Sequence, residues 1–349
     1  ENGRIVTMTR NFAAAAGPVT LSAGQLYDAQ DRVLRDIFPD GSALEHTYSP
    51  RGLELPLANF ITNIDYDALT RWRRIVLPSG AALHRNLDRG GRVLGQRVTA
   101  DKRALLSLAH RYDVAGQLAE TRDDLAAEGF SLSQTFVYDD LRRLVGHNVA
   151  GTSHTWRHSD DGNLLDHAGH VLAYDDARPH AAVALDHQAL HYDAAGQLAE
   201  ITGEGPLPGG SWRHDPHGRV QSFTAADGRR VEHVHAYTGE RAIRREYDAS
   251  GRLEHEVLYF TKNAEVRDGQ LVRWIFFAGE RLAESPVPMP AGGFGDFSIA
   301  PGTTTPTSPR QLGGLVVLLL LGLLALCSAA SRTARPRWRI APAVLALAS

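Results

Sequence analysis

Cysteine is almost absent from this sequence of 349 residues: Cys327 stands alone, so no disulfide can form within the chain. A basic surplus is absent too, since the formal net charge is −3, whereas proteins that follow nucleic-acid phosphates are normally strongly basic. Helical periodicity is scarce before residue 300, where only 101–109 and 123–127 allow short helical turns as an alternative to insertions between strands. We therefore expect an all-β chain with no nucleic-acid partner.

Catalytic motifs are absent as well. The sequence has no G-x-S-x-G elbow, no phosphate-cradling G-x-x-x-x-G-K-[ST] loop and no H-E-x-x-H helix. The most suggestive histidines among the sixteen are the close pairs His233/His235, His154/His158 and His167/His170. A tight metal site needs three or four converging ligands, and these pairs do not supply them. We therefore predict no catalytic, cofactor-binding or metal-binding residues, no cofactor, and no enzymatic activity.

Neighbouring acids form a second set of candidates for carboxylate catalysis or calcium binding: Asp123-Asp124, Asp139-Asp140, Asp160-Asp161 and Asp175-Asp176. Adjacent residues of an extended chain point to opposite faces, so these pairs are not natural dyads. The Asp-x-Asp-x-Asp-Gly spacing of a calcium loop is missing too. We expect these carboxylates to serve turns of the backbone.

Internal repetition is the dominant signal, and the repeated unit is aromatic-Asp-x-x-Gly-Arg/Gln-Leu/Val. Near-ideal copies are Tyr112-Asp113 with Gly116-Gln117-Leu118, Tyr192-Asp193 with Gly196-Gln197-Leu198, and Tyr247-Asp248 with Gly251-Arg252-Leu253. Copies at Leu87-Asp88 and His214-Asp215 replace the tyrosine, and weaker ones begin at Tyr27, Tyr48, Tyr66, Tyr138 and His158. Histidine in the aromatic position favours packing over metal binding.

Each unit predicts a β-hairpin. Asp is well placed to accept hydrogen bonds from backbone amides two residues on, and Gly supplies the positive φ of a tight turn. A second class of turn falls between copies, at Pro39-Asp40-Gly41, Pro78-Ser79-Gly80 and Ala226-Asp227-Gly228. Two alternating turn classes indicate a meander of short strands, and such hairpins bury an apolar face only by stacking on their neighbours. Trp72, Trp156, Trp212 and Trp274 fall in or near these strands, where we expect core packing rather than sugar stacking.

The character of the chain changes near residue 286. Residues 286–311 are rich in Pro, Gly, Thr and Ser, which is typical of a flexible linker. Leu312 to Ala330 then form an uncharged apolar run that, at 1.5 Å per residue, spans roughly 28 Å, close to the ~30 Å hydrocarbon core of a bilayer. The flank 331–349 carries four arginines and reopens an apolar run at Ile340 that leaves a second helix open. By the positive-inside rule we expect one transmembrane helix, a cytoplasmic flank and an extracytoplasmic repeat region.

The repeated unit resembles the YD repeats of the Rhs/YD-repeat family, which includes bacterial Rhs proteins, Tc-toxin C-type subunits and teneurins. The likeness covers about Tyr27 to Glu284, and 272–284 (VRWIFFAGERLAE) resembles the strand pair that closes such arrays. The resemblance implies a β-ribbon that spirals into a hollow shell, which in toxin-bearing members encloses a toxic domain. Two departures are that no Rhs-associated core segment follows Glu284 and that the chain has no room for a toxin domain.

From this resemblance we expect residues 1–285 to form a YD-repeat β-shell region of a bacterial membrane-anchored protein that houses or delivers a toxin. The alternative is a surface-anchored adhesin that contacts glycans or other cells. Since the chain opens on Glu1, we expect it to be a piece of a longer protein. The toxin or ligand and the oligomeric state are left open.

Overall fold

The computed structural model describes residues 6–127, 131–149 and 151–288, and all regular elements in these residues are β-strands. The all-β prediction is thus confirmed for this part of the chain. The strands are β1 (Thr7–Ala14), β2 (Gly17–Tyr27), β3 (Val33–Ile37), β4 (Ala43–Glu45), β5 (Asn63–Tyr66), β6 (Trp72–Val76), β7 (Ala82–Leu87), β8 (Val93–Ala100), β9 (Arg103–Tyr112), β10 (Leu118–Asp123), β11 (Gln134–Tyr138), β12 (Leu144–Val149), β13 (Thr152–His158), β14 (Leu164–His167), β15 (His170–Ala173), β16 (Ala184–Leu185), β17 (Gln188–Tyr192), β18 (Leu198–Thr202), β19 (Gly210–His214), β20 (Val220–Ala225), β21 (Arg230–His235), β22 (Arg241–Tyr247), β23 (Leu253–Thr261), β24 (Ala264–Arg267), β25 (Gln270–Phe277) and β26 (Glu280–Pro288).

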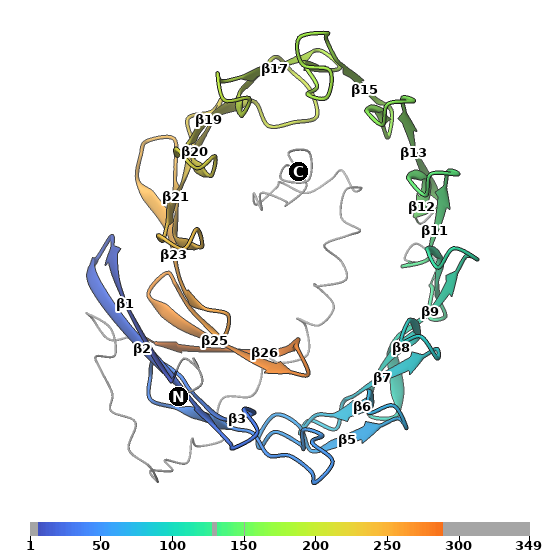
Figure 1. Ribbon diagram of the computed structural model, residues 1–349, viewed down its shortest axis with the longest axis vertical. Coiled ribbons are helices and arrows are strands. Elements are labelled where there is room, and N and C mark those ends of the chain that lie inside the picture. The colour runs from blue at the N-terminus through green and yellow to red at the C-terminus, as the bar shows by residue number, and fades with distance from the viewer. Residues whose placement is uncertain (1–5, 128–130, 150, 289–349) are drawn as a thin grey trace. The chain divides into compact units, whose positions relative to one another are not determined.

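The strands form two antiparallel meanders. A four-stranded sheet has the order β1-β2-β3-β4, and from β5 to β26 each strand pairs with the next one in the chain (Figure 1). The short helical turns considered for 101–109 do not form. Asp101 and Lys102 instead take positive φ angles of 48° and 64° in a two-residue turn, and β9 begins directly after it. The predicted meander of hairpins is therefore confirmed.

The two faces of the long meander differ in chemistry. On one face, Ile64, Ile75, Leu83, Val98 and Leu106 are successive cross-strand partners, and Ile75 is 1% exposed. Tyr66 lies two residues beyond Ile64 on the same strand, so it belongs to this face, which we call the tyrosine face. The other face carries the polar partners one residue along, namely Asp65, Arg74, His84, Arg97 and Ser107. The period of two in the sequence thus separates an apolar from a polar face.

The first strands of the chain pack on its last ones. Phe12 in β1, with Val19 and Leu21 in β2, shares a buried core with residues of β22 to β25 such as Leu258 and Phe260. The rings of Phe12 and Phe260 meet edge to face, with centroids 6.4 Å apart. Arg10 Nη1 also donates to the Tyr259 carbonyl oxygen at 3.1 Å. Burial of large apolar side chains contributes about 1.5–3 kcal/mol each, so this core fastens the start of the chain to the end of the array.

No helix long and apolar enough to cross a membrane is found among residues 6–127, 131–149 and 151–288. The predicted membrane span, Leu312 to Ala330, and the flank 331–349 lie outside these residues. Of the predicted linker, residues 286–288 continue β26, and the remainder likewise lies outside the described residues.

Candidate functional site

Each repeat closes as a five-residue hairpin turn that is organised by its aspartate. In the copy at Asp215, the backbone N–H of Asp215 donates to the Arg219 carbonyl, and the N–H of Gly218 donates to the Asp215 carbonyl, each at 2.9 Å. The Asp215 carboxylate accepts from the backbone N–H groups of His217 and Arg219 at 2.9 and 3.0 Å. Gly218 has a φ of 79°, the left-handed conformation that glycine adopts without strain. The repeat therefore encodes its turn locally.

The same hydrogen bonds recur in the other copies. The turns at 28–32, 67–71, 88–92, 113–117, 139–143, 193–197 and 248–252 repeat the backbone pair, with Asp at the first position. Ser49 and Ser159 replace Asp in two turns and accept through the hydroxyl oxygen instead. A further copy, at Ala236, has no side chain that can accept and was missed in the sequence for that reason. The second predicted turn class, at 38–42, 77–81 and 225–229, has the same backbone hydrogen bonds and is therefore not a separate type.

A guanidinium at the fifth turn position neutralises the aspartate. Arg219 Nε donates to Asp215 Oδ2 at 2.6 Å, and Arg71 makes the same contact with Asp67 at 2.8 Å. The side-chain hydrogen bond from Arg219, followed by backbone N–H groups, lowers the pKa of Asp215 to about 2. These carboxylates are thus ionised structural acceptors, which leaves them no proton to give in catalysis.

The fifth residue also reaches the next turn on the same side of the meander. Arg219 Nη1 donates to the Ala236 carbonyl at 3.4 Å, Arg71 Nη1 to that of Asp88 at 3.0 Å, and Gln117 Nε2 to that of Arg142 at 2.9 Å. Similar bonds run from Arg143 to Ser159, from Asn163 to Pro179 and, from a fourth turn position, from Arg178 to Asp193. We call this series, formed by Arg71, Gln117, Arg143, Asn163, Arg178 and Arg219, the turn ladder. The turn ladder links turns that lie next to each other at the same end of the strands, although another turn, at the opposite end, lies between them in the sequence.

The repeat tyrosines make a second link between copies. The hydroxyls of Tyr48, Tyr112 and Tyr138 donate to the carbonyls of Val33, Val93 and Leu118, at 2.9, 2.9 and 3.0 Å. Each acceptor is the first residue after the preceding turn at the same end of the strands, namely the turns 28–32, 88–92 and 113–117. Tyr66 bonds the Glu54 carbonyl in the same way, and its burial, with the nearby charge of Glu54, raises its pKa to about 12. The Tyr66 phenol therefore remains a protonated donor at every physiological pH.

One near-ideal copy lies at the opposite end of the strands from the others. Turns alternate between the two ends of a meander, and the turn 248–252 joins β22 to β23, whereas 215–219 joins β19 to β20. Tyr247 accordingly donates to the Glu232 carboxylate at 3.0 Å instead of to a carbonyl of a preceding copy. The copy at Tyr247 has the full repeat sequence, but its turn lies at the same end of the strands as the second turn class, such as 225–229.

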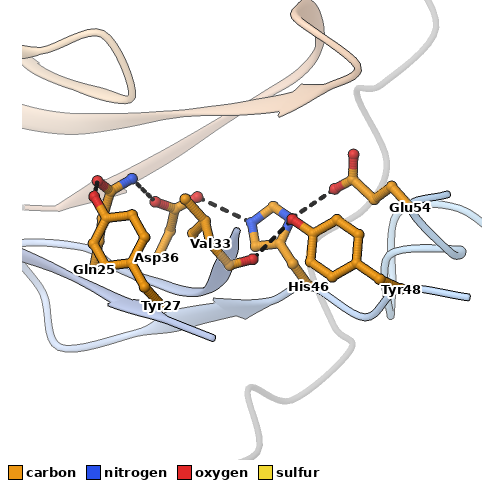
Figure 2. Close-up of polar contacts among 7 residues, drawn as sticks. All are labelled: Gln25, Tyr27, Val33, Asp36, His46, Tyr48 and Glu54. Atoms are coloured by element: carbon orange, nitrogen blue, oxygen red, sulfur yellow. Dashed lines mark hydrogen bonds and ion pairs between the residues drawn. The ribbon is translucent and has the colours of Figure 1, made fainter. Parts of the chain in front are cut away.

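A buried cluster of ionisable side chains lies in the sheet β1–β4 and the loop after it (Figure 2). His46 Nε2 lies 3.0 Å from Asp36 Oδ2, and His46 Nδ1 lies 2.7 Å from Glu54 Oε1. Gln25 donates to the other oxygen of Asp36 at 2.7 Å and accepts from the Tyr27 hydroxyl at 2.6 Å. The imidazole is 9% exposed.

The charges of this cluster fix its protonation. Burial by itself lowers the pKa of His46, but hydrogen bonds to the two flanking carboxylates outweigh that effect and raise the pKa to about 9. Both ring nitrogens then donate, so the imidazolium has no free lone pair with which to act as a general base. The cluster is an ion triad that holds β3, β4 and the loop at Glu54 together. The sequence offered no signal for it, because its members come from separate segments.

The predicted candidates do not converge. No group of three or more His, Cys, Asp or Glu that could hold a metal ion occurs in the described part of the chain. His233 and His235 do share a strand face, with ring centroids 6.3 Å apart, and Asp139 serves its turn as expected. Among the tryptophans, Trp72 and Trp274 are buried as predicted, at 6% and 8% exposed, whereas Trp156 and Trp212 are half-buried.

The described geometry defines a class of protein, an antiparallel array of Tyr-Asp hairpins. No family model matches the sequence, and no curated protein is similar to it. Solved structures do share the fold. The crystal structure of TcdB2-TccC3-Cdc42 matches 81% of this chain with 19% of its own, at 13% identity and a TM-score of 0.51. That of TcdB2-TccC3-TEV matches 80% with 19%, at 14% identity and a TM-score of 0.50.

A structure of the Photorhabdus luminescens Tc holotoxin pore also matches, over 78% of this chain and 17% of its own, at 14% identity and a TM-score of 0.46. The chain thus spans 19% of the length of these TcdB2-TccC3 chains. The predicted resemblance to the Rhs/YD-repeat family is confirmed at the level of the fold.

Proposed function

We propose that this chain is a structural wall segment of an Rhs-like shell that houses or delivers a polypeptide toxin, and that it is not an enzyme. The observation that carries this proposal is how the repeats use their polar groups. The aspartates bind their own turns, the fifth-position residues bind the next turn, and the tyrosines bind the preceding one. Side chains committed to neighbouring backbone suit a wall, whereas an active site needs groups directed at a substrate.

We also propose that the segment Leu312 to Ala330 anchors the protein in a bacterial membrane, with the repeats outside and the flank 331–349 in the cytoplasm. The apolar run and the arginines after it support this topology. A tag in the exposed loop 203–206, between β18 and β19, tests it in intact producing cells treated with protease. Cleavage of the tag from outside is the expected result. Full protection until the cells are lysed would overturn the topology.

Enclosure of a toxin is tested separately, in the longer parent protein. The polypeptide carried with the array should resist protease while the array is intact. It should become cleavable when the turn ladder is broken by Arg143→Ala together with Arg219→Ala. The matched control is Arg252→Ala, because Arg252 pairs with Asp248 in its own turn and with Glu254 of β23, and bonds no other turn among the described residues. Equal cleavage of the intact and the ladder-broken protein would contradict enclosure.

The alternative function, a glycan-contacting adhesin, is favoured by the aromatic pairs on the tyrosine face. The rings of Trp212 and Phe223 lie 4.6 Å apart across two strands, and both residues are only half-buried. Half-exposed rings of this kind can stack on sugars. Binding of the whole chain to immobilised glycans that is lost in Trp212→Ala but kept in Trp72→Phe would favour the adhesin over the shell wall.

A further inference from the structure

Histidines gather on the tyrosine face of the middle of the array. His158, His214 and His235 stand in the aromatic position directly before a turn, and His110 and His233 stand two residues before that position. Two residues apart on a strand means the same face. Register adds the rest: His147 is paired with Phe136, His154 with His147, and His167 with Trp156. Strands β9 to β21 thus carry the following histidines on one face: His110, His147, His154, His158, His167, His214, His233 and His235.

Aromatic rings surround part of this set. The imidazole of His147 stacks on Phe136 with centroids 4.8 Å apart and lies 6.2 Å from the ring of His154. Trp156 meets His167 edge to face at 5.9 Å. His147 also bonds Gln134 through Nε2, and His110 bonds the Thr121 hydroxyl through Nδ1, both at 3.0 Å. The partners of these imidazoles are therefore neutral groups.

Positive charges face His233 and His235. Arg241 and Arg244, on the neighbouring β22, lie across from His235 and His233, and Arg219 acts on His235 from the turn before β20. Asp215, already bonded to Arg219, is the one carboxylate that raises the pKa of His235, and burial and the arginines outweigh it. In the described residues, no histidine of this face has a carboxylate within ion-pair distance, unlike His46, His170 and His255.

We propose that this histidine face is an acid-sensitive seam, so that mild acidification charges it and loosens the array between β9 and β21. At neutral pH the imidazoles of His110, His147, His233 and His235, whose pKa values burial lowers, pack as uncharged rings. When they gain protons, they place cations against aromatic rings, against one another and against Arg241 and Arg244. The carboxylate that shares this face of β22, Glu246, is already paired with Arg244. If the array is the wall of a shell, acidification would open the shell and release its content. Only this consequence rests on the proposed function.

The direction of the effect follows from linkage. Burial, with Arg241, Arg244 and His235, lowers the pKa of His233 from 6.5 to about 4. Burial likewise lowers the pKa of His110 and of His147. A group whose pKa is lower in the folded chain binds more protons when unfolded, so stability is lost as the pH falls below about 6.5. At pH 5, His233 alone should shift the unfolding equilibrium by about 30-fold toward the unfolded chain.

The test uses the full chain at pH 7.5 and pH 5.0, with the unfolding equilibrium measured in urea. Between pH 7.5 and pH 5.0, the unfolding equilibrium of wild type should shift toward the unfolded chain by about 30-fold more than that of His233→Gln. Both proteins share the opposite contribution of His46, whose pKa of about 9 favours the folded chain as the pH falls, so it cancels in this comparison. His217→Gln is the matched control, because His217 is an exposed residue of the turn 215–219. This variant should behave like wild type. An equal response of wild type and His233→Gln to acid would overturn the seam.

Limited proteolysis of the wild type keeps the test independent of any variant that fails to fold. With a protease active at both pH values, new cuts at pH 5.0 should fall within 103–235 and spare β23 to β26. Cuts spread evenly along the chain, or confined to β23–β26, would contradict the inference. Because neither experiment requires cargo, an absent seam with successful toxin protection would remove this inference and leave the proposed shell standing.

Discussion

The ion triad at His46 makes a quantitative prediction about alkaline stability. The pKa of His46 is about 9 in the folded chain, against 6.5 for an ordinary histidine. A difference of about 2.5 pKa units corresponds to about 3 kcal/mol of folding free energy, since each unit is worth about 1.4 kcal/mol. The side chain is 9% exposed, so solvent screens this contribution little. Because the folded pKa is the higher one, the contribution is fully present below pH 6.5 and is lost as the pH rises through 9.

The perturbation is His46→Gln, which keeps polar contacts within reach of Asp36 and Glu54 but removes the charge. Urea unfolding is measured at pH 6.0 and pH 9.5 for the variant and for wild type, with His187→Gln in an exposed turn as control. At pH 6.0 the variant should be less stable than wild type by about 3 kcal/mol, and at pH 9.5 the gap should nearly close. A gap of the same size at both pH values would refute the charged triad.

Three further predictions concern the turns and the core. Thr70→Gly should stabilise the chain by about 1 kcal/mol in urea unfolding, because Thr70 is a β-branched residue held at a φ of 65°; a loss of stability would contradict this. Asp215→Ala should lower the urea midpoint, because two backbone N–H groups lose their acceptor, whereas Asp160→Ala, in an exposed turn position, should leave it unchanged; equal midpoints for the two variants would argue against the turn role. Phe12→Ala should cost about 3 kcal/mol and expose β1–β2 to protease, since Phe12 is 3% exposed; an unchanged digestion pattern would mean that this hairpin is not fastened by its core.

The features that the sequence predicted well are the local ones. A turn such as 215–219 is determined by Asp215 and Gly218 themselves, so the repeat could be recognised without any knowledge of its neighbours. The separation of an apolar from a polar face followed from alternation, as at Ile64 and Asp65. Both inferences depend only on residues that lie within about five positions of each other in the sequence.

Features that depend on distant segments could not be predicted. The Tyr247 copy has an ordinary repeat sequence, and its place at the other end of the strands follows from counting every strand between it and Tyr192. The His46 triad joins Asp36 of β3 to His46, directly after β4, and to Glu54 in the following loop, and Phe12 meets Phe260 across most of the chain. A single sequence contains no periodicity that reports such pairings.

The central claim is that the fifth-position residues lock each turn to the next one in space, and amide hydrogen exchange of Arg219→Ala tests it most directly. Loss of Arg219 should speed exchange in its own turn, 215–219, and also in the turn 236–240, whose Ala236 carbonyl it binds. In the matched variant Arg252→Ala, faster exchange should stay within 248–252, because Arg252 bonds its own turn aspartate and, in the described part of the chain, no other turn. If Arg219→Ala leaves the turn 236–240 as protected as in wild type, the turns are independent and the wall is not locked in this way.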